Sequence, residues 1–228
     1  MAEPVAVIFD MDGVLVDSAQ AHRRAWQQLG DEVGVPFSAQ LFQETFGQRN
    51  ATILPRWLGD METPRLAALE RRKESLYRDF VRQGAVRIYA GVGTLLDVLR
   101  RGDAKTAIAS SGPRENVELL IPLMDIADRI DATVTAEDVR HGKPDPEVFL
   151  IAAARLRVPR ERCAVIEDSV HGIEAARRAG MLAVAVLTST ARPQLVAAGA
   201  DWCVQEIGAL DGEALLARLQ QRAGARGA

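Results

Sequence analysis

Two aspartates, Asp10 and Asp12, directly follow the apolar run 5–9 and precede Gly13. A short apolar run rich in β-branched residues predicts a buried parallel strand. Alternate residues of an extended segment point the same way, so both carboxylates should face one cleft at the carboxyl end of that strand. Two carboxylates this close repel each other unless a shared proton or a hard cation such as Mg²⁺ is present. Because Asp-x-Asp-Gly also occurs in turns and Ca²⁺ loops, this motif alone leaves a metal site and an ordinary turn open.

Three later segments also place polar side chains at expected strand ends or in a tight loop. Ser110 and Ser111 follow one apolar run, Lys143 lies in a Gly-Lys-Pro loop, and Glu167 and Asp168 follow another apolar run. Each has an ordinary alternative: a Ser-Ser-Gly turn, a surface lysine, and a pair of helix-capping acids. The proline after Lys143 excludes this lysine from a helix and so fixes it in a short loop.

The four segments, in this order, resemble the four motifs of the haloacid dehalogenase superfamily of phosphotransferases, in its subfamily IA. The resemblance covers nearly the whole chain and is similar in kind to the β-phosphoglucomutase-like and sugar-phosphate phosphatase-like branch. It implies phosphoryl transfer through an aspartyl-phosphate, with Asp10 as nucleophile and Asp12 as general acid and base. A carboxylate that attacks a phosphate dianion meets strong repulsion, which a bridging Mg²⁺ offsets. The implied phosphate-binding residues are Ser110, Ser111 and Lys143, and the implied metal ligands are Asp10, Asp168, Glu167 and the backbone carbonyl of Asp12.

The fold expected from these patterns is α/β: a Rossmann-like parallel sheet core with an inserted helical-bundle cap. From residue 91 onward apolar strand patterns alternate with helical ones, which indicates βαβ units that share a sheet with the strand at 5–9. We expect a core of residues 1–16 and 89–228, and a cap of residues 17–88 in which no strand-like run appears. The expected strands are 104–109, 132–135, 163–166, 182–187 and 202–204, and the expected core helices are 92–101, 114–123, 147–156, 170–179, 192–198 and 212–221.

Helix-start signals add three local expectations. Ser18 should be the N-cap of a helix over residues 19–29, which ends near two glycines. Pro64 suits the first turn of a long helix that runs to about residue 82. Asp145 should be the N-cap of the helix that follows the Lys143 loop. The helical insertion directly follows the first aspartate motif, so it can cover the site.

Three residues of the expected cap match the mutase branch individually. His22 would help to gate the general acid and base, while Arg49 and Lys73 would contact a sugar phosphate; as an alternative, all three are exposed helix residues. At residues 112–114 the mutase has a polar Ser-Lys-Asn stretch that grips the second phosphate, whereas this chain has Gly-Pro-Arg. We therefore expect a phosphatase of small phosphorylated metabolites such as sugar or polyol phosphates. A β-phosphoglucomutase-type mutase is the alternative, and a non-catalytic phosphometabolite-binding protein is a third reading.

Composition limits the remaining classes. The net charge of −3 gives no basic surface, so no nucleic acid partner is expected. No apolar run approaches the ~20 residues that span a bilayer, and the N-terminus leaves no room for a signal peptide. Cys163 and Cys203 lie in apolar runs, which favours buried free thiols in a reducing compartment. We expect a cytoplasmic monomer or small homo-oligomer without membrane contact.

Overall fold

The computed structural model describes residues 4–224, which form two compact units. The core unit holds the described residues up to Val16 and from Ile88 onward, and the helical unit holds Asp17–Arg87. The helical unit is thus an insertion in a chain that otherwise builds one α/β layer structure.

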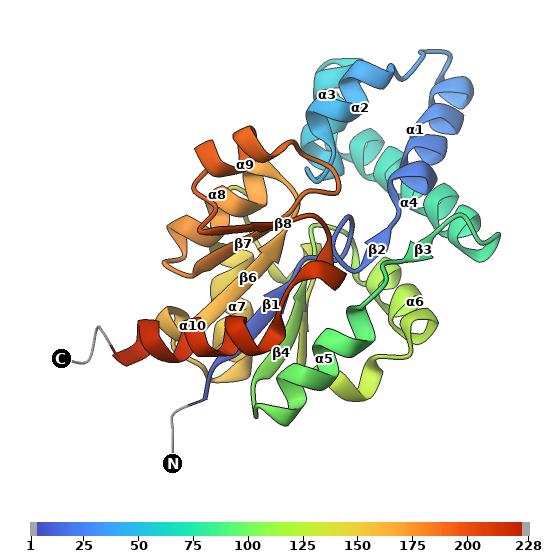
Figure 1. The fold of residues 1–228 in the computed structure, drawn as a ribbon. Helices are drawn as coiled ribbons and strands as arrows, with labels where there is room; N and C mark the ends of the chain where they lie inside the picture. Colours follow the sequence, from blue (N-terminus) through green and yellow to red (C-terminus); the bar gives the residue numbers. More distant parts are fainter. Residues whose placement is uncertain (1–3, 225–228) are drawn as a thin grey trace. The chain divides into compact units, whose positions relative to one another are not determined.

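The core unit is built on one parallel sheet, with the strand order β5-β4-β1-β6-β7-β8 (Figure 1). The central position of β1 confirms that the first apolar run belongs to the same sheet as the later strands. All four residues of β1 are buried, as expected for a parallel strand covered on both faces. The strands are β1 (Ala6–Phe9), β4 (Lys105–Ala109), β5 (Ala132–Val134), β6 (Cys163–Glu167), β7 (Leu182–Val186) and β8 (Trp202–Val204).

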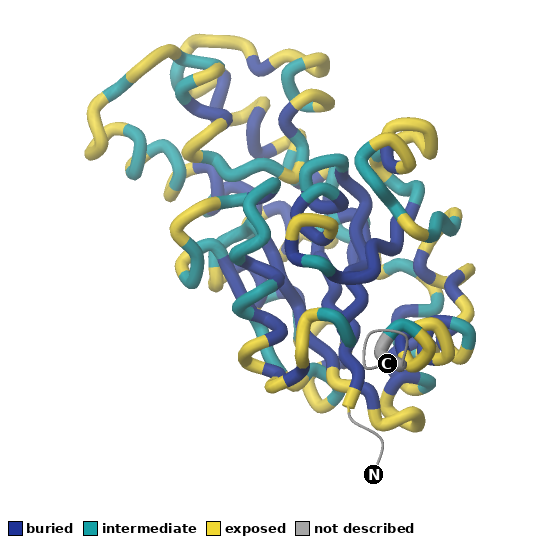
Figure 2. Tube along the Cα trace, turned by 90° about the vertical axis from the view of Figure 1, so that its left-hand side faces the viewer, coloured by how far each residue is buried: buried dark blue, intermediate teal, exposed yellow. Residues whose placement is uncertain are grey.

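Helices cover both faces of this sheet, which leaves the strands as the most buried part of the core unit (Figure 2). On one face α7 (Glu147–Leu156) packs against β1, β4 and β5, and α8 (Val170–Arg178) packs against β6 and β7. On the other face α5 (Val92–Arg101) contacts β4 and α10 (Gly212–Gly224) (Figure 1). The remaining elements of this unit are α6 (Arg114–Met124), α9 (Arg192–Ala197) and the 3₁₀ turns η1 (Ala127–Arg129), η2 (Ala136–Asp138), η3 (Arg160–Arg162) and η4 (Ile207–Ala209).

The helical unit contains α1 (Ala19–Val33), α2 (Ala39–Thr45), α3 (Asn50–Leu58) and α4 (Thr63–Arg82), and α4 packs against α1 and α3. Its apolar centre includes Trp26, whose ring stacks on Phe37 at a centroid distance of 4.8 Å. Trp57 meets both rings edge-on. The short strands β2 (Val16–Asp17) and β3 (Arg87–Ile88) pair with each other.

Four local expectations need correction. The first helix continues through Gly30 to Val33. Gly30 does not end the helix; its missing side chain makes room for the chain at Val35, since a Cβ on Gly30 would lie 2.8 Å from the carbonyl oxygen of Val35. Ser18 is the N-cap of this helix, as expected, and the correction is that its side chain accepts no hydrogen bond from the first turn. The N-cap before α7 is Pro146, and Asp145 lies one position earlier. Of the two free thiols, only Cys163 is buried, while Cys203 is partly exposed.

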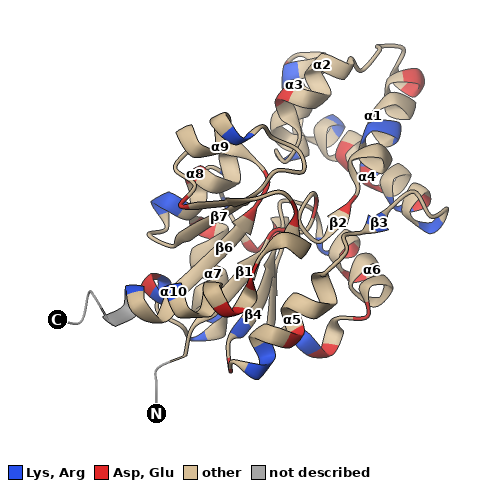
Figure 3. Ribbon diagram, in the orientation of Figure 1, with Lys and Arg blue, Asp and Glu red and all other residues tan. Residues whose placement is uncertain are grey.

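Lysine and arginine residues and aspartate and glutamate residues both occur on the helices of each unit (Figure 3). Many of them form ion pairs within one unit, including Arg72 with Glu32 and Arg177 with Asp201. Exposed pairs of this kind contribute little to stability. In the part of the chain that the structure describes, no helix has the length and apolar character needed to cross a membrane.

Candidate active site

Asp10 lies immediately after β1 and is 7% exposed. The chain then turns sharply at Gly13, whose φ of +82° is a left-handed conformation that favours glycine. A Cβ on Gly13 would lie 1.9 Å from Oδ2 of Asp168, so this position also needs glycine for space. Asp12, between these two residues, is partly exposed. The turn therefore holds a buried and a partly exposed carboxylate at the end of the central strand.

Lys143 connects the ends of three neighbouring strands. Its Nζ donates to Oδ1 of Asp10 at 2.5 Å, to Oε1 of Glu167 at 2.6 Å and to the carbonyl oxygen of Ala109 at 3.3 Å. These acceptors stand at the carboxyl ends of β1, β6 and β4, which are adjacent in the sheet. The lysine is itself buried, at 8% exposure, so the surface alternative for Lys143 is wrong.

Glu167 and Asp168 begin the turn that leads from β6 into α8. Oε2 of Glu167 accepts the backbone N–H of Asp168 at 2.9 Å and of Ser169 at 3.0 Å, and also the Ser169 hydroxyl. Ser169, and neither acid, is the residue whose side chain caps α8, through the Gly172 N–H. The buried Oδ2 of Asp168, by contrast, has no hydrogen-bond partner among the described residues.

The protonation of this cluster follows from burial and like charge. Burial, with the neighbouring carboxylates of Glu167 and Asp12, raises the pKa of Asp10 to about 7, although Lys143 acts to lower it. Burial, together with Glu167 and Asp10, also raises the pKa of Asp168 well above its ordinary value. For Lys143, burial acts to lower the pKa, but the attraction of Asp10 and Glu167 outweighs it and raises the pKa. The ammonium thus stays charged beside carboxylates that are costly to ionise.

This donor set fits a divalent cation. Oxygen atoms of Asp10, Glu167 and Asp168 lie within 4.8 Å of one another. The raised pKa values of Asp10 and Asp168, and the unpartnered oxygen of Asp168, fit a site that a hard cation stabilises, and Mg²⁺ prefers a few carboxylates together with water. Asp168 Oδ2 faces the turn at Gly13, so the unpartnered oxygen lies beside the loop that carries Asp10 and Asp12.

Ser110 and Ser111 follow β4 on the same edge of the sheet. Ser110 is 2% exposed, and its Oγ accepts the Gly112 N–H at 3.0 Å, a local bond that fits the alternative of a Ser-Ser-Gly turn and leaves the phosphate-binding role a prediction. Ser111 is partly exposed. The residue before Ser110 gives its carbonyl oxygen to Lys143, which brings the serine loop and the lysine together.

A second loop holds the serine loop in place. The Gly112 carbonyl oxygen accepts the Ala136 N–H at 3.0 Å. The carboxylate of Glu137 accepts the Arg114 N–H at 3.0 and 3.2 Å, which places a negative charge at the first residue of α6. The Arg114 guanidinium pairs with Asp138 at 3.3 Å. Arg155 also donates to Asp138, and this bond holds the pKa of Asp138 well below its usual range.

The cap residues singled out in the sequence lie in the helical unit. Nζ of Lys73 lies 2.8 Å from Nδ1 of His22 and donates to Glu74 at 2.8 Å. Lys73 is 2% exposed, so the alternative of an exposed lysine is wrong there. An ammonium group only donates, so Nδ1 of His22 is the acceptor and the ring proton is on Nε2. Arg49 is partly buried at the start of α3, and its charge acts on Glu70, whose pKa is nevertheless raised by burial.

Two functional candidates were missed in the sequence. Thr188 donates its hydroxyl to the Gly13 carbonyl oxygen at 2.5 Å, and the next residue, Ser189, acts to lower the pKa of the Asp168 carboxyl. Both follow β7, as Asp10 follows β1. The rule that polar residues after parallel strands meet at one edge would have found them.

Known proteins resemble this chain in sequence and in fold. The sequence pattern of the family described as haloacid dehalogenase-like hydrolase matches residues 5–180. The β-phosphoglucomutase of Bacillus subtilis (strain 168) is 35% identical over 208 residues, which are 88% of this chain and 89% of that protein. The phosphorylated carbohydrates phosphatase of Thermotoga maritima is 32% identical over 178 residues, 77% of this chain and 82% of that protein. The crystal structure of CbbY from Rhodobacter sphaeroides in complex with phosphate matches with a TM-score of 0.82 at 26% identity, covering 95% of this chain and 100% of that one.

Proposed function

The chain belongs to the haloacid dehalogenase-like hydrolases, and from this premise we propose that it is a Mg²⁺-dependent phosphatase of small sugar or polyol phosphates. Its relatives are named as a phosphatase of carbohydrates and as a phosphoglucomutase, so it is an enzyme that acts on phosphate esters. A cytoplasmic setting is consistent with its two free thiols. A monomeric or small homo-oligomeric state stays a prediction.

Asp10 is the proposed nucleophile. Its carboxylate would attack the phosphorus atom, form an aspartyl-phosphate and release the alcohol, and water would then hydrolyse this intermediate. Mg²⁺ held by Asp10 and Asp168, with Glu167 and the Asp12 carbonyl nearby, would reduce the repulsion between carboxylate and phosphate. Lys143 contacts Asp10 directly and would neutralise phosphate charge, while Ser110 and Ser111 would hold the phosphoryl oxygens.

Asp12 is the proposed general acid and base. It is partly exposed, in contrast to buried Asp10, so it can reach both a leaving group and solvent. It would protonate the leaving oxygen in the first step and take a proton from water in the second. Its partial exposure and the burial of Asp10 give the two carboxylates different environments, as two different roles require.

The observation that carries this proposal is the unpartnered, buried Oδ2 of Asp168 beside the Lys143–Asp10 pair. The test is phosphate release from a panel of sugar, polyol and glycolate phosphates, with Mg²⁺ and with excess chelator. Asp10→Asn keeps the shape of the side chain but removes the nucleophile, and it should lower turnover at least ~10³-fold. Full activity in chelator, or substantial turnover by purified Asp10→Asn, would contradict the mechanism.

A second variant separates an enzyme from a binding protein. Asp12→Ala should lose ~10²–10⁴-fold in turnover, because general acid–base catalysis contributes that much. It should still bind Mg²⁺ and inorganic phosphate, since Asp12 contributes no side chain to either in this scheme. Unchanged turnover of an alkyl phosphate would refute the role assigned to Asp12, whereas binding of Mg²⁺ and phosphate by a wild type that turns over no ester would support the non-catalytic alternative.

The second candidate is a phosphosugar mutase, which the contact of buried Lys73 with partly exposed His22 favours. A mutase must bind a bisphosphate in two orientations, so it needs cationic donors for a second phosphate. Here the loop after Ser111 has glycine and proline, which offer no side-chain donor. The Arg114 guanidinium is paired with Asp138. The Arg114 backbone N–H already donates to the Glu137 carboxylate. This charge-balanced arrangement supports the phosphatase.

A further inference from the structure

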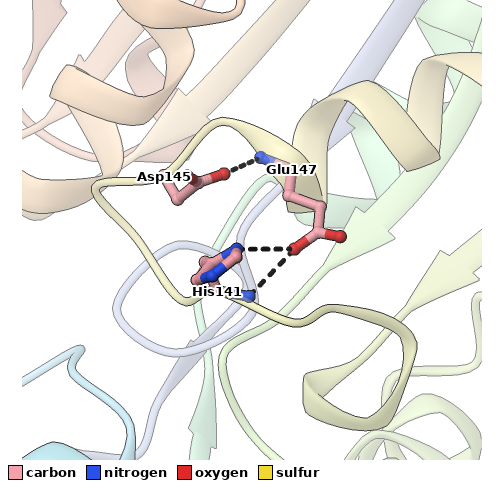
Figure 4. Close-up of side chains that lie close together, drawn as sticks. All are labelled: His141, Asp145 and Glu147. Carbon is pink, nitrogen blue, oxygen red and sulfur yellow. Dashed lines mark hydrogen bonds and ion pairs between the residues drawn. The ribbon is translucent and has the colours of Figure 1, made fainter.

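The loop that carries Lys143 is closed by one carboxylate. Oε2 of Glu147, the first residue of α7, accepts the backbone N–H of Arg140 at 2.8 Å and of His141 at 2.9 Å. Figure 4 shows this carboxylate turned back toward His141, while Asp145 Oδ1 accepts the Glu147 N–H at 2.9 Å. The Gly142 carbonyl oxygen accepts the Asp145 N–H at 3.0 Å. Lys143 therefore lies inside a ring of hydrogen bonds that begins and ends at Glu147.

The helix that carries Glu147 is packed into the core of the sheet. Phe149 and Ala152 of α7 are fully buried in the main apolar cluster of the sheet. On the other side of the loop, Arg178 of α8 donates to the Pro144 carbonyl oxygen at 3.1 Å. Because α7 packs on β1, β4 and β5, the Glu147 side chain ties the loop to a helix that contacts two of the three strands whose ends bind the Lys143 ammonium, β1 and β4.

His141, Asp145 and Glu147 lie close enough together to suggest a metal site. Their contacts indicate instead that Glu147 stabilises the loop. Its Oε2 is already engaged by two N–H donors, and Oδ1 of Asp145 by a third. Nδ1 of His141 lies 3.8 Å from the same Glu147 oxygen, but the histidine side chain is 73% exposed and such a pair is screened by water. The two backbone bonds are the ones that constrain the loop.

We propose that Glu147 is a positioning residue for Lys143: it holds the 140–146 loop so that Nζ reaches Asp10 and Glu167 together. This inference rests on the proposed function, because the role of Lys143 in phosphoryl transfer belongs to it. The ammonium lies 2.5 Å from one carboxylate and 2.6 Å from the other, so a shift of the loop by about an ångström breaks one of the bonds. Misplacement on that scale costs about 10²-fold in rate in well-ordered sites.

The test compares Glu147→Ala, Glu147→Gln and wild type, with Glu213→Ala as the matched control. Glu213 is also a first-turn glutamate of a core-unit helix, and it is exposed on α10. Three readouts are needed: hydrogen–deuterium exchange of the segment 140–146, kcat/KM for the most active phosphate ester, and Mg²⁺ affinity by calorimetry. A glutamine retains an oxygen that accepts both N–H groups, so Glu147→Gln should rescue what alanine loses.

We expect Glu147→Ala to exchange faster over 140–146 and to lose about 10- to 100-fold in kcat/KM. Its Mg²⁺ affinity should not weaken, because a displaced ammonium competes less for Asp10. Glu147→Gln and Glu213→Ala should stay within about threefold of wild type. General loosening of the site would instead weaken Mg²⁺ binding and turnover together.

The inference is overturned if Glu147→Ala shows unchanged exchange over residues 140–146 or a kcat/KM within twofold of wild type. It is also overturned if the Mg²⁺ affinity of Glu147→Ala falls together with its kcat/KM, or if Glu147→Gln is as impaired as Glu147→Ala. If wild type releases no phosphate from any ester, the proposed function fails. The exchange measurement still decides in that case whether Glu147 holds the Lys143 loop.

Discussion

At the scale of residues, the site is a problem of charge balance. Lys143 supplies one positive charge to a buried cluster that contains Asp10, Glu167 and Asp168. With every group ionised the four side chains carry two surplus negative charges, which burial makes costly. Either protons or a divalent cation can remove that surplus. The raised pKa values of Asp10 and Asp168 express this competition.

This competition predicts how stability depends on pH and Mg²⁺. The pKa of Asp10 in the folded protein, about 7, lies above its ordinary value of 3.8. Folding therefore takes up a proton between these values, and the stability from this group declines as the pH rises through that window. Mg²⁺ requires the deprotonated carboxylate, so its affinity should increase from pH 6 to pH 8. Without metal, the melting temperature should thus be lower at pH 8 than at pH 6, and Mg²⁺ should raise it more at pH 8, by about 3 °C.

Thermal unfolding at both pH values, with Mg²⁺ and with chelator, measures this effect. Asp10→Asn is the matched control, because an amide cannot take up the proton and its midpoint should change less with pH. Lys143 does not contribute to the difference between pH 6 and pH 8, because its pKa is raised from an already high value and its ammonium stays charged at both pH values. An equal Mg²⁺ shift at pH 6 and pH 8 would show that no carboxylate proton is displaced.

At the scale of elements, the sequence predicted which strands exist better than where helices begin. Strands such as β6 and β7 are continuous apolar runs buried on both faces, and that pattern is legible without tertiary information. Gly30 was misjudged because its reason to be glycine is the close approach of Val35, a contact between segments. The same holds for Ser18 and Asp145, whose capping potential depends on where the neighbouring chain runs.

Some residues of the candidate site could likewise be predicted from the sequence, while others could not. Residue type and strand-end position identified Asp10, Lys143 and Asp168 as candidates, and the structure brings these three together. Their roles remain proposals. Glu147 gave no functional signal, because a first-turn glutamate is common in helices and only the geometry shows its bonds to the preceding loop. Strand-end position could also have placed Thr188 at this edge of the sheet, but the hydrogen bond from its hydroxyl to the Gly13 carbonyl oxygen is visible only in the structure.

The loop pair that carries Ser110 and Glu137 leads to a prediction about substrate charge. Glu137 and Asp138 balance Arg114 and Arg155, so this region has no surplus positive charge for a second anionic group. Glu137→Gln removes one negative charge from this group, so the group carries a net positive charge at the start of α6. A charge at a helix N-terminus contributes about 0.3–1 kcal/mol, equivalent to about two- to fivefold. The variant should improve kcat/KM for phosphoglycolate relative to glycerol phosphate by that factor.

The matched control for this comparison is Glu118→Gln, which removes the same charge one turn further along α6 from an exposed position. It should leave the ratio of the two kcat/KM values unchanged. If Glu137→Gln lowers both values equally, Glu137 only stabilises the loop and does not select substrates by charge.

At the scale of the whole molecule, the residues proposed for chemistry all belong to the core unit, while His22, Arg49 and Lys73 belong to the helical unit. The chain enters the helical unit soon after Asp10 and returns to the sheet at β4. We therefore expect bond-making to depend on residues of the core unit and substrate choice on residues of the helical unit. The sequence indicated this division through composition alone, but it contained no information on the buried Lys73–His22–Glu74 contacts.

Whether the protein is a hydrolase or a mutase depends on how many phosphate sites the two units supply. The core unit offers one set of proposed phosphate donors, Ser110, Ser111 and Lys143, and a charge-balanced region beside it. In the helical unit Lys73 already donates to Glu74, which leaves less of its charge for a second phosphate. We therefore expect β-glucose 1-phosphate to yield free glucose and phosphate, with negligible glucose 6-phosphate, in an assay that follows all three products with a trace of glucose 1,6-bisphosphate present. Arg49→Ala should mainly raise KM, since a residue that binds ground state and transition state equally affects binding alone. Conversion to glucose 6-phosphate that depends on the bisphosphate and outpaces phosphate release would establish the mutase instead.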